Sequence, residues 1–232
     1  MAAVELATGA WRVPTAPFDL VNSYLLANGD GSLTLVDAGL RNAHKKVLAA
    51  LDGLGRSPRD VTRILMTHAH PDHAGGLAAA KAATGADVVT HDRDAVYLRE
   101  GRPPSTDGSR WQNRLFGRLP FRGFGKVEVA DTFMDGTVLE GGIRVVHTPG
   151  HSPGHCSFLH EPSGVLITGD AIFNVRGLRY SPQAFCTDVR LSRESARVLG
   201  ELDYETAAFT HGAHVTQGAR EAVRAFLAGR PS

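Results

Sequence analysis

This chain has few cysteines, no long apolar runs and no excess of charge of one sign. Two cysteines, Cys156 and Cys186, among 232 residues are too few for a disulfide framework, so both are expected to be buried thiols. No segment approaches the roughly 20 apolar residues of a membrane-spanning helix, and residues 1–11 lack a secretory signal pattern. The formal net charge of +1 gives no field that would attract nucleic acid or a membrane. These absences predict a cytoplasmic protein that binds neither.

The chain has enough apolar residues for one large core, because 42% of its 232 residues are hydrophobic. Strands come first and helices later in each half, which predicts an α/β fold in which two layers of sheet and helix pack sheet against sheet. We expect one domain over residues 1–232, made of two pseudo-symmetric halves. The expected strands are 18–27, 32–36, 61–66, 86–90, 127–129, 137–139, 143–147, 156–160, 165–168 and 207–210, and the expected helices are 42–54, 74–84, 92–99, 189–202 and 217–227.

The segment Thr67–His73 contains three imidazoles and one carboxylate. Neutral histidine and ionised aspartate are the usual nitrogen and oxygen ligands of zinc-like ions. The segment follows an apolar, β-branched strand and precedes a helix, so it lies at the carboxyl end of a strand, where open α/β sheets place their chemistry. Four donors so close in sequence cannot all bind one ion tetrahedrally. We therefore expect His68 and His70 on one ion and Asp72 and His73 on another.

Three further ligand candidates follow strands in the second half of the chain. His151 lies in a loop whose proline and glycine residues force turns. Asp170 and His211 each follow an apolar strand. One histidine after a strand is more often a hydrogen-bonded structural residue, but three such positions together with the first cluster indicate one shared site. His147 and His214 are alternatives to His151 and His211, because they lie close to them in sequence.

Together these segments resemble the metallo-β-lactamase-fold hydrolase superfamily. The resemblance rests on His-x-His-x-Asp-His, Thr-Pro-Gly-His-Ser-Pro-Gly-His, Thr-Gly-Asp and His-Gly, in this order, and extends from Val36 to His211. It implies a four-layer αββα sandwich with two divalent metal ions at one edge of its sheets. Zinc is the expected metal, with iron and manganese as alternatives. By position, the resemblance assigns His68, His70 and His151 to one ion, Asp72, His73 and His211 to the other, and Asp170 to a bridge between them.

The same resemblance suggests roles for residues around the ligands. Asp37 lies in an Asp-x-Gly turn and is expected to orient a ligand without binding the metal. His155, four residues after His151, is expected to support a ligand or the fold. The other histidines, His44, His91 and His160, are expected to be ordinary surface or core residues.

The chemistry implied by such a site is hydrolysis of a small acyl substrate, such as a thioester, an ester or a lactone. Two divalent ions about 3.5–4 Å apart share a hydroxide near neutral pH, and this hydroxide attacks the substrate carbonyl. Asp72 is the candidate catalytic residue, since a carboxylate beside that hydroxide accepts and returns its proton. A mononuclear iron persulfide dioxygenase and a β-lactam hydrolase are the alternative functions.

The sequence departs from individual branches of the family, and these differences reduce the number of candidate substrates. Zinc β-lactamases of the best-known type have a cysteine where this chain has Asp170, which disfavours that activity. Acyl-homoserine lactonases place a functional tyrosine three residues after the bridging aspartate, where this chain has Phe173, and Tyr180 is a distant substitute. Glyoxalase II shares every ligand but carries a C-terminal helical domain for glutathione, whereas only residues 212–232 follow His211 here. A stand-alone glyoxalase II-like thioesterase or a lactonase is therefore expected.

Residues 100–126 form an insert rich in arginine and aromatic residues, and the net charge over residues 99–126 is +5. Arg110, Arg114 and Arg118 share one face if this segment is helical. A solvated helix face is the simplest interpretation. The functional interpretation is a lid that attracts an anionic small-molecule substrate, and the apolar side chains also fit a homodimer surface. One such stretch is weak evidence for nucleic-acid binding, which we do not expect.

Overall fold

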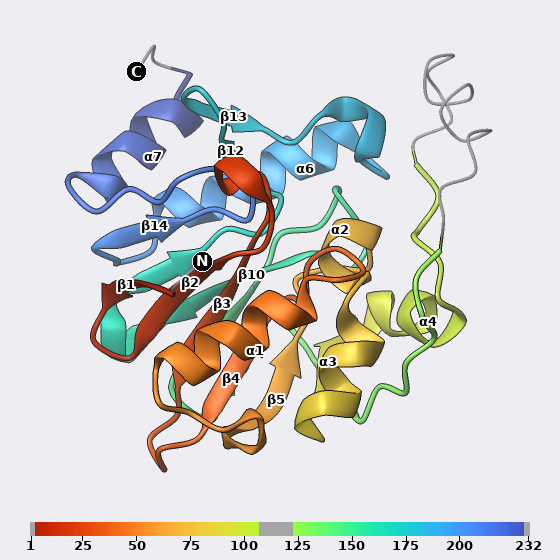
Figure 1. Cartoon of the computed structure of the whole chain (residues 1–232). Coiled ribbons are helices and arrows are strands. Elements are labelled where there is room, and N and C mark those ends of the chain that lie inside the picture. The colour runs from red at the N-terminus through yellow and green to blue at the C-terminus, as the bar shows by residue number, and fades with distance from the viewer. Residues whose placement is uncertain (1–2, 107–122, 230–232) are drawn as a thin grey trace.

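The computed structural model describes residues 3–106 and 123–229 as two β-sheets packed face to face, with helices on both outer faces (Figure 1). Within these residues, the first sheet has seven strands in sequence order: β1 (Val4–Ala7), β2 (Ala10–Pro14), β3 (Asn22–Ala27), β4 (Leu33–Val36), β5 (Val61–Leu65), β6 (Asp87–His91) and β7 (Asp131–Phe133). The second has five, in the order β14 (Thr206–Ala208), β11 (Val165–Ile167), β10 (Cys156–His160), β9 (Ile143–His147) and β8 (Val138–Leu139). A separate hairpin consists of β12 (Ile172–Asn174) and β13 (Leu178–Tyr180).

The helices of the first half of the chain cover the first sheet, and those of the second half cover the second sheet. Those of the first half are α1 (His44–Gly53), α2 (Pro71–Ala74), α3 (Leu77–Thr84) and α4 (Asp92–Glu100), and those of the second half are α6 (Val189–Ser195) and α7 (Ala219–Leu227). No helix in the described part of the chain has both the length and the apolar character needed to span a bilayer.

Among the described residues, three apolar clusters fill the spaces between the layers. Buried residues of α1, α3 and α4 pack against Ile64 and its neighbours on the outer face of the first sheet. Tyr24 and Phe158 belong to the cluster between the two sheets. Leu199 and α7 residues pack against Leu166 on the outer face of the second sheet. These layers form the expected αββα sandwich, in which each sheet has one face toward the other sheet and one toward helices.

The N-terminal strands differ from the prediction. β1 and β2 were not expected at all, and the strand predicted to begin at Phe18 begins at Asn22. Pro17 starts a short 3-10 turn, in which Phe18 and Asp19 have φ angles of 56° and 55°. An extended strand cannot accommodate positive φ angles, so the strand begins only after this turn.

Two further segments correct the prediction in the second half of the chain. Residues 127–129 form no strand, although Val127 and Val129 are both buried, as in a strand. The Val127 amide donates to the Leu98 carbonyl at 3.1 Å, which ties this segment to α4. The helix expected over 189–202 is split, because a 3-10 segment, Ala196–Gly200, follows α6.

Parallel strand pairing explains how distant segments reach one place. Strands β4, β5 and β6 are parallel to one another, and β11 is parallel to β14. The carboxyl ends of parallel strands lie at the same edge of a sheet. His68–His73 follow β5, whereas Asp170 and His211 follow β11 and β14. Each sheet therefore presents its candidate ligands at one edge.

The predicted insert over residues 100–126 falls partly outside the described residues. Arg110, Arg114 and Arg118 belong to residues 107–122, which the structure does not describe. At the borders of this segment, the Phe124 amide donates to the Gly101 carbonyl at 3.0 Å. The roles expected for the insert as lid, dimer surface or solvated face therefore stay predictions.

Candidate metal centre

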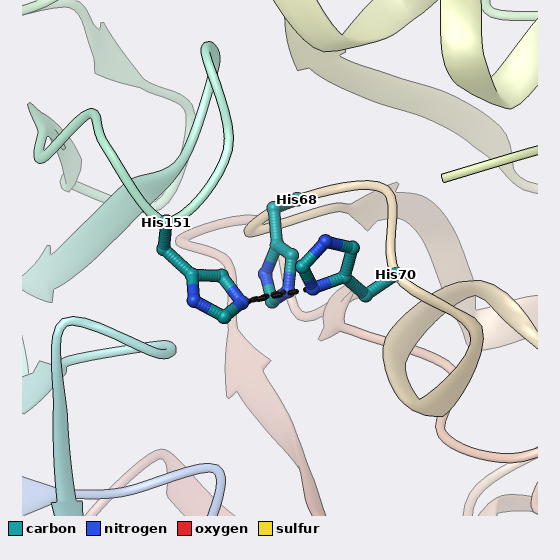
Figure 2. Close-up of side chains that lie close together, drawn as sticks. All are labelled: His68, His70 and His151. Atoms are coloured by element: carbon teal, nitrogen blue, oxygen red, sulfur yellow. Dashed lines mark hydrogen bonds between the residues drawn. The ribbon is translucent and has the colours of Figure 1, made fainter. Parts of the chain in front are cut away.

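The first group of candidate ligands is a set of three buried imidazoles from two loops. His68 and His70 lie in the loop between β5 and α2, and His151 lies in the loop between β9 and β10 (Figure 2). Nε2 of His151 is 3.1 Å from Nε2 of His68 and 2.8 Å from Nδ1 of His70. Burial, followed by neighbouring imidazoles, lowers the pKa of His68 and of His70 well below the usual value. Both rings are therefore neutral, which is the form that binds metal.

The Asp170 carboxylate lies between this group and a second one. Its Oδ2 atom is 3.2 Å from Nε2 of His151 and 3.9 Å from Nε2 of His68. Its Oδ1 atom is 3.2 Å from Nε2 of His73 and 3.2 Å from Nε2 of His211. One carboxylate oxygen thus faces each group, which is the placement expected of a bridging ligand.

Asp72, His73 and His211 form the second group. Oδ2 of Asp72 is 3.4 Å from Nε2 of His211 and 3.9 Å from Nε2 of His73. The His73 side chain is fully buried, whereas that of Asp72 is 36% exposed. This group therefore combines a buried nitrogen ligand with a carboxylate that a solvent molecule or a substrate can reach.

The electrostatics of the cluster favour cations. Burial acts to lower the pKa of His151, but Asp170 raises it to about 9. The same competition between burial and Asp170 raises the pKa of His211, and raises that of His73 well above its usual value. Burial acts to raise the pKa of Asp170, but the imidazoles of His211, His73 and His151 hold it well below its usual range. Asp170 therefore favours positive charge on these three rings, which either a proton or a metal ion can supply.

Unpaired buried atoms show that the donor set fits metal ions. His73 Nε2 and His211 Nε2 each lie 3.2 Å from Asp170 Oδ1, yet these three buried atoms form no hydrogen bond with one another or with any other described residue. Buried polar atoms normally have partners, and an ion is one explanation when they do not. Imidazole nitrogens and carboxylate oxygens are also suitable ligands for divalent zinc, iron or manganese. These residues therefore fit a divalent metal centre.

Asp37 orients His73 and anchors the loop that carries the first cluster. Its Oδ2 atom lies 2.7 Å from Nδ1 of His73, so that Nε2 of this ring faces Asp170. The Thr67 amide donates to Oδ1 of Asp37 at 2.8 Å, and the Thr67 hydroxyl donates to Oδ2 at 2.7 Å. The contact expected for Asp37 is therefore present, because a carboxylate that binds the far nitrogen fixes both ring orientation and tautomer.

His155 supports Asp170 through its backbone. Nε2 of His155 accepts a hydrogen bond from the Asp170 amide at 2.8 Å, and Nδ1 donates to the Thr148 carbonyl at 3.0 Å. Burial lowers the pKa of His155 to about 3, so the ring is neutral and both bonds can form. This placement agrees with the supporting role expected for His155.

Three partners of the ligands could not be predicted from local sequence. Ser181 Oγ lies 2.8 Å from Nδ1 of His151, and the Leu20 carbonyl lies 2.5 Å from Nδ1 of His211. Cys186, a buried free thiol like Cys156, has its Sγ 3.8 Å from the same His151 nitrogen. These contacts join residues far apart in sequence, and no motif marks them.

Several residues named as alternatives lie elsewhere. His147 stacks on His91 with ring centroids 4.1 Å apart, and its Nε2 is 3.1 Å from the Pro153 carbonyl. Neither His147 nor His214 belongs to the ligand groups found among the described residues. The Tyr180 ring packs against Phe226 in the apolar cluster on the outer face of the second sheet. Phe173 occupies the position of that tyrosine, with its ring centroid 4.3 Å from that of His211.

Asn22 of β3 holds the strand end from which His211 projects. Its side-chain amide donates to the Phe209 carbonyl at 3.0 Å and to the Gly212 carbonyl at 2.9 Å. Asn22→Ala is expected to lower the free energy of unfolding by about 1–3 kcal/mol, because buried carbonyls lose their donor. This loss corresponds to a melting temperature lower by about 2–12 °C for a domain of this size. Thermal unfolding followed by circular dichroism measures the change.

Asn42→Ala is the matched control, because Asn42 is exposed. Surface substitutions of this kind change stability by less than about 0.5 kcal/mol. If Asn22→Ala melted at the same temperature as Asn42→Ala, the bonds from Asn22 would not stabilise the His211 strand end.

A family model described as the metallo-beta-lactamase superfamily matches residues 16–211, a range that contains every candidate ligand. The chain belongs to the metallo-β-lactamase superfamily. It is 34% identical over 158 residues to an uncharacterised protein of Bacillus subtilis, YobT, which covers 68% of this chain and 64% of YobT. It is 38% identical over 151 residues to a hydroxyacylglutathione hydrolase of Anaeromyxobacter dehalogenans, which covers 65% of this chain and 46% of that protein. The chain therefore spans less than two thirds of the length of either relative.

A solved structure shows the same superfamily fold. The native FEZ-1 metallo-β-lactamase from Legionella gormanii matches with a TM-score of 0.76 over 99% of this chain and 92% of that one, at 18% identity. At this identity the likeness concerns the fold alone. Metallo-β-lactamase superfamily membership implies divalent metal binding, and the histidine and aspartate groups described above supply suitable ligands.

Proposed function

We propose that this chain is a dinuclear metal-dependent hydrolase of a small acyl substrate, namely a thioester, an ester or a lactone. His68, His70 and His151 would hold one ion, Asp72, His73 and His211 the other, and Asp170 would bridge them. The observation that carries the proposal is the position of Asp170, whose two oxygens each lie 3.2 Å from imidazole nitrogens of a different group. Zinc is the proposed metal.

The metal ions would supply Lewis acidity toward a carbonyl oxygen and a water molecule that loses a proton near neutral pH. The chain's own residues do the rest. Asp72 is the proposed catalytic residue, because its carboxylate is part of the second group and is 36% exposed, so that it can take up and return a proton at Oδ2. The apolar Phe173 ring packs beside His211, whose Nε2 lies 3.4 Å from this carboxylate.

Two findings support an acyl substrate and a thioester in particular. One relative at 38% identity is a hydroxyacylglutathione hydrolase, whose substrate is by its name a thioester of glutathione. The net charge of +5 over residues 99–126 favours an anionic substrate, although most of this segment lies outside the described residues. A small anionic thioester is therefore the first substrate to test, and a homodimer formed through the same segment is a separate proposal.

A second candidate function rests on one ligand group. His68, His73 and Asp170 offer two imidazoles and one carboxylate within 4.8 Å of one another. Two histidines and a carboxylate are the ligands of many non-haem iron oxygenases. A mononuclear iron persulfide dioxygenase would use such a group, and its activity is oxygen uptake that depends on a thiol persulfide.

The test combines metal analysis with a substrate screen. The chain is purified without added metal, its zinc and iron contents are measured, and turnover is assayed with an anionic thioester, its neutral analogue, a lactone and a β-lactam. Close to two zinc ions per chain with thioester or lactone hydrolysis is the expected result. One iron ion per chain with persulfide-dependent oxygen uptake and no hydrolysis would replace the proposal by the oxygenase, and lactam turnover alone would replace the substrate class.

A further inference from the structure

Asp94 is a buried carboxylate that binds both loops of the first ligand group. It lies in the first turn of α4, and its exposed fraction is 0%. Its Oδ2 atom accepts hydrogen bonds from the Ala69 amide at 2.9 Å and from the Ser152 hydroxyl at 2.7 Å. Its Oδ1 atom accepts a hydrogen bond from the Gly154 amide at 2.7 Å. One side chain therefore joins two loops that belong to different halves of the molecule.

The donors lie directly beside the candidate ligands. Ala69 separates His68 from His70, and Ser152 follows His151. The backbone on either side of these donors sets where the three imidazoles point. A carboxylate that fixes both donors therefore also fixes the spacing between the pair His68 and His70 and the single ring of His151, which is 2.8–3.1 Å between nitrogens here.

Close packing supports the same interpretation. A Cβ atom placed on Gly154 would lie 2.7 Å from the Asp94 backbone nitrogen and 2.8 Å from Oδ1 of Asp94. The loop that carries Gly154 therefore lies so close to α4 that only glycine fits at this position. Burying a carboxylate is costly unless it is fully hydrogen-bonded, and charge-assisted bonds of 2.7–2.9 Å to three donors meet that requirement. An ordinary apolar side chain at position 94 would avoid this cost but could not bind the loops.

We propose that Asp94 is a positioning residue for the metal ion at His68, His70 and His151. It acts by bonding the backbone of both ligand loops and not by touching the ion. This inference rests on the proposed function, because it requires that these three imidazoles bind a metal. It goes beyond that proposal by assigning the geometry of one ion to a residue outside both ligand groups.

The experiment is Co²⁺ and Zn²⁺ titration of the metal-free chain and of the Asp94→Asn variant. Asparagine has nearly the same shape, but its amide nitrogen cannot accept the bond that a carboxylate oxygen accepts. The affinity for the metal ion at His68, His70 and His151 is expected to fall about 10- to 100-fold in this variant. This is the usual effect of losing a side chain that orients metal ligands. The visible absorption spectrum of bound Co²⁺ is expected to change in the manner of His151→Ala and not in the manner of His211→Ala.

Two further variants make the result decisive. Asp92→Asn is the matched control: Asp92 also lies in the first turn of α4, but its carboxylate is 48% exposed and contacts His91, so both affinities are expected to stay at the wild-type level. Ser152→Ala removes one of the three bonds and is expected to weaken the first ion about 2- to 10-fold. This milder variant answers the question if Asp94→Asn does not fold.

The outcomes separate this inference from the proposed function. A wild-type chain that binds no metal would refute the proposed function and this inference with it. A wild-type chain that binds two ions, with unchanged affinities in Asp94→Asn and Ser152→Ala, would overturn the positioning role alone. An equal loss of affinity for both ions in these variants would also overturn the positioning role, because Asp94 would then support the fold in general. A loss of affinity confined to the ion at His68, His70 and His151 supports the positioning role.

Discussion

Asp170→Asn is expected to lower kcat/KM for the preferred acyl substrate by on the order of 10²–10³-fold, the range seen when one charged or polar group is removed from a reaction centre. The physical reason is that both oxygens of Asp170 are in use, one toward His73 and His211 and one toward His151. An amide keeps one acceptor oxygen, so the variant can serve only one of the two ligand groups. Steady-state kinetics together with metal content per chain measure the effect, and less than two ions per chain is the expected content.

The control for this substitution is Asp135→Asn. Asp135 accepts a hydrogen bond from the His147 amide at 2.8 Å, but it belongs to none of the ligand groups in the described residues. Its replacement is expected to leave kcat/KM and metal content at the wild-type level. If Asp170→Asn retained full activity and two ions, Asp170 would not be the bridge, and the dinuclear proposal would lose the observation that carries it.

The location of the site was predictable because it depends on strand ends. His68–His73, Asp170 and His211 each follow an apolar run, and apolar runs of four to eight residues are a strong strand signal. The strands β5, β11 and β14 formed where these runs predicted them, with boundaries shifted by one or two residues. Parallel pairing within each sheet then determines that the following residues meet at an edge.

The residues that orient the ligands could not be predicted, because their contacts depend on tertiary structure alone. Asp94 binds donors 25, 58 and 60 residues away, and Asn22 binds carbonyls about 190 residues away. No periodicity or short motif reports such contacts. An aspartate in the first turn is common in surface helices, where it only complements the helix dipole, so Asp94 gave no distinct signal in the sequence.

The secondary-structure errors have a similar origin. Val127 and Val129 alternate in burial as in a strand, but they pack in the apolar layer that also holds buried residues of α4, and the Val127 amide bonds the Leu98 carbonyl. Alternation of apolar residues predicts one buried face, and only the fold determines what covers that face. Phe18 shows the converse error. It belongs to an apolar run typical of a strand, but it lies on a turn with a positive φ angle, and its side chain is 94% exposed.

Removal of the metal by a chelator is expected to lower the melting temperature of the zinc-bound chain by about 8–16 °C. Zinc at about 1,000 times its Kd adds about 4 kcal/mol to the free energy of unfolding, and about 2–4 °C per kcal/mol applies to domains of this size. A zinc ion would compete with the protons whose binding to His73, His151 and His211 Asp170 favours. Differential scanning calorimetry with and without chelator measures the difference.

The pH dependence of this difference tests the cluster itself. The raised pKa values of His73, His151 and His211 stabilise the metal-free fold below the unfolded histidine pKa of about 6.5, and this contribution is lost as pH rises toward about 9, the pKa of His151. Zinc affinity changes in the opposite direction, because fewer protons compete for the nitrogens at higher pH. The gap between the zinc-bound and metal-free melting temperatures is therefore expected to widen from about pH 6 to about pH 9. A chelator that left the melting temperature unchanged across this range would show that the buried histidines and Asp170 form a structural polar network and hold no metal.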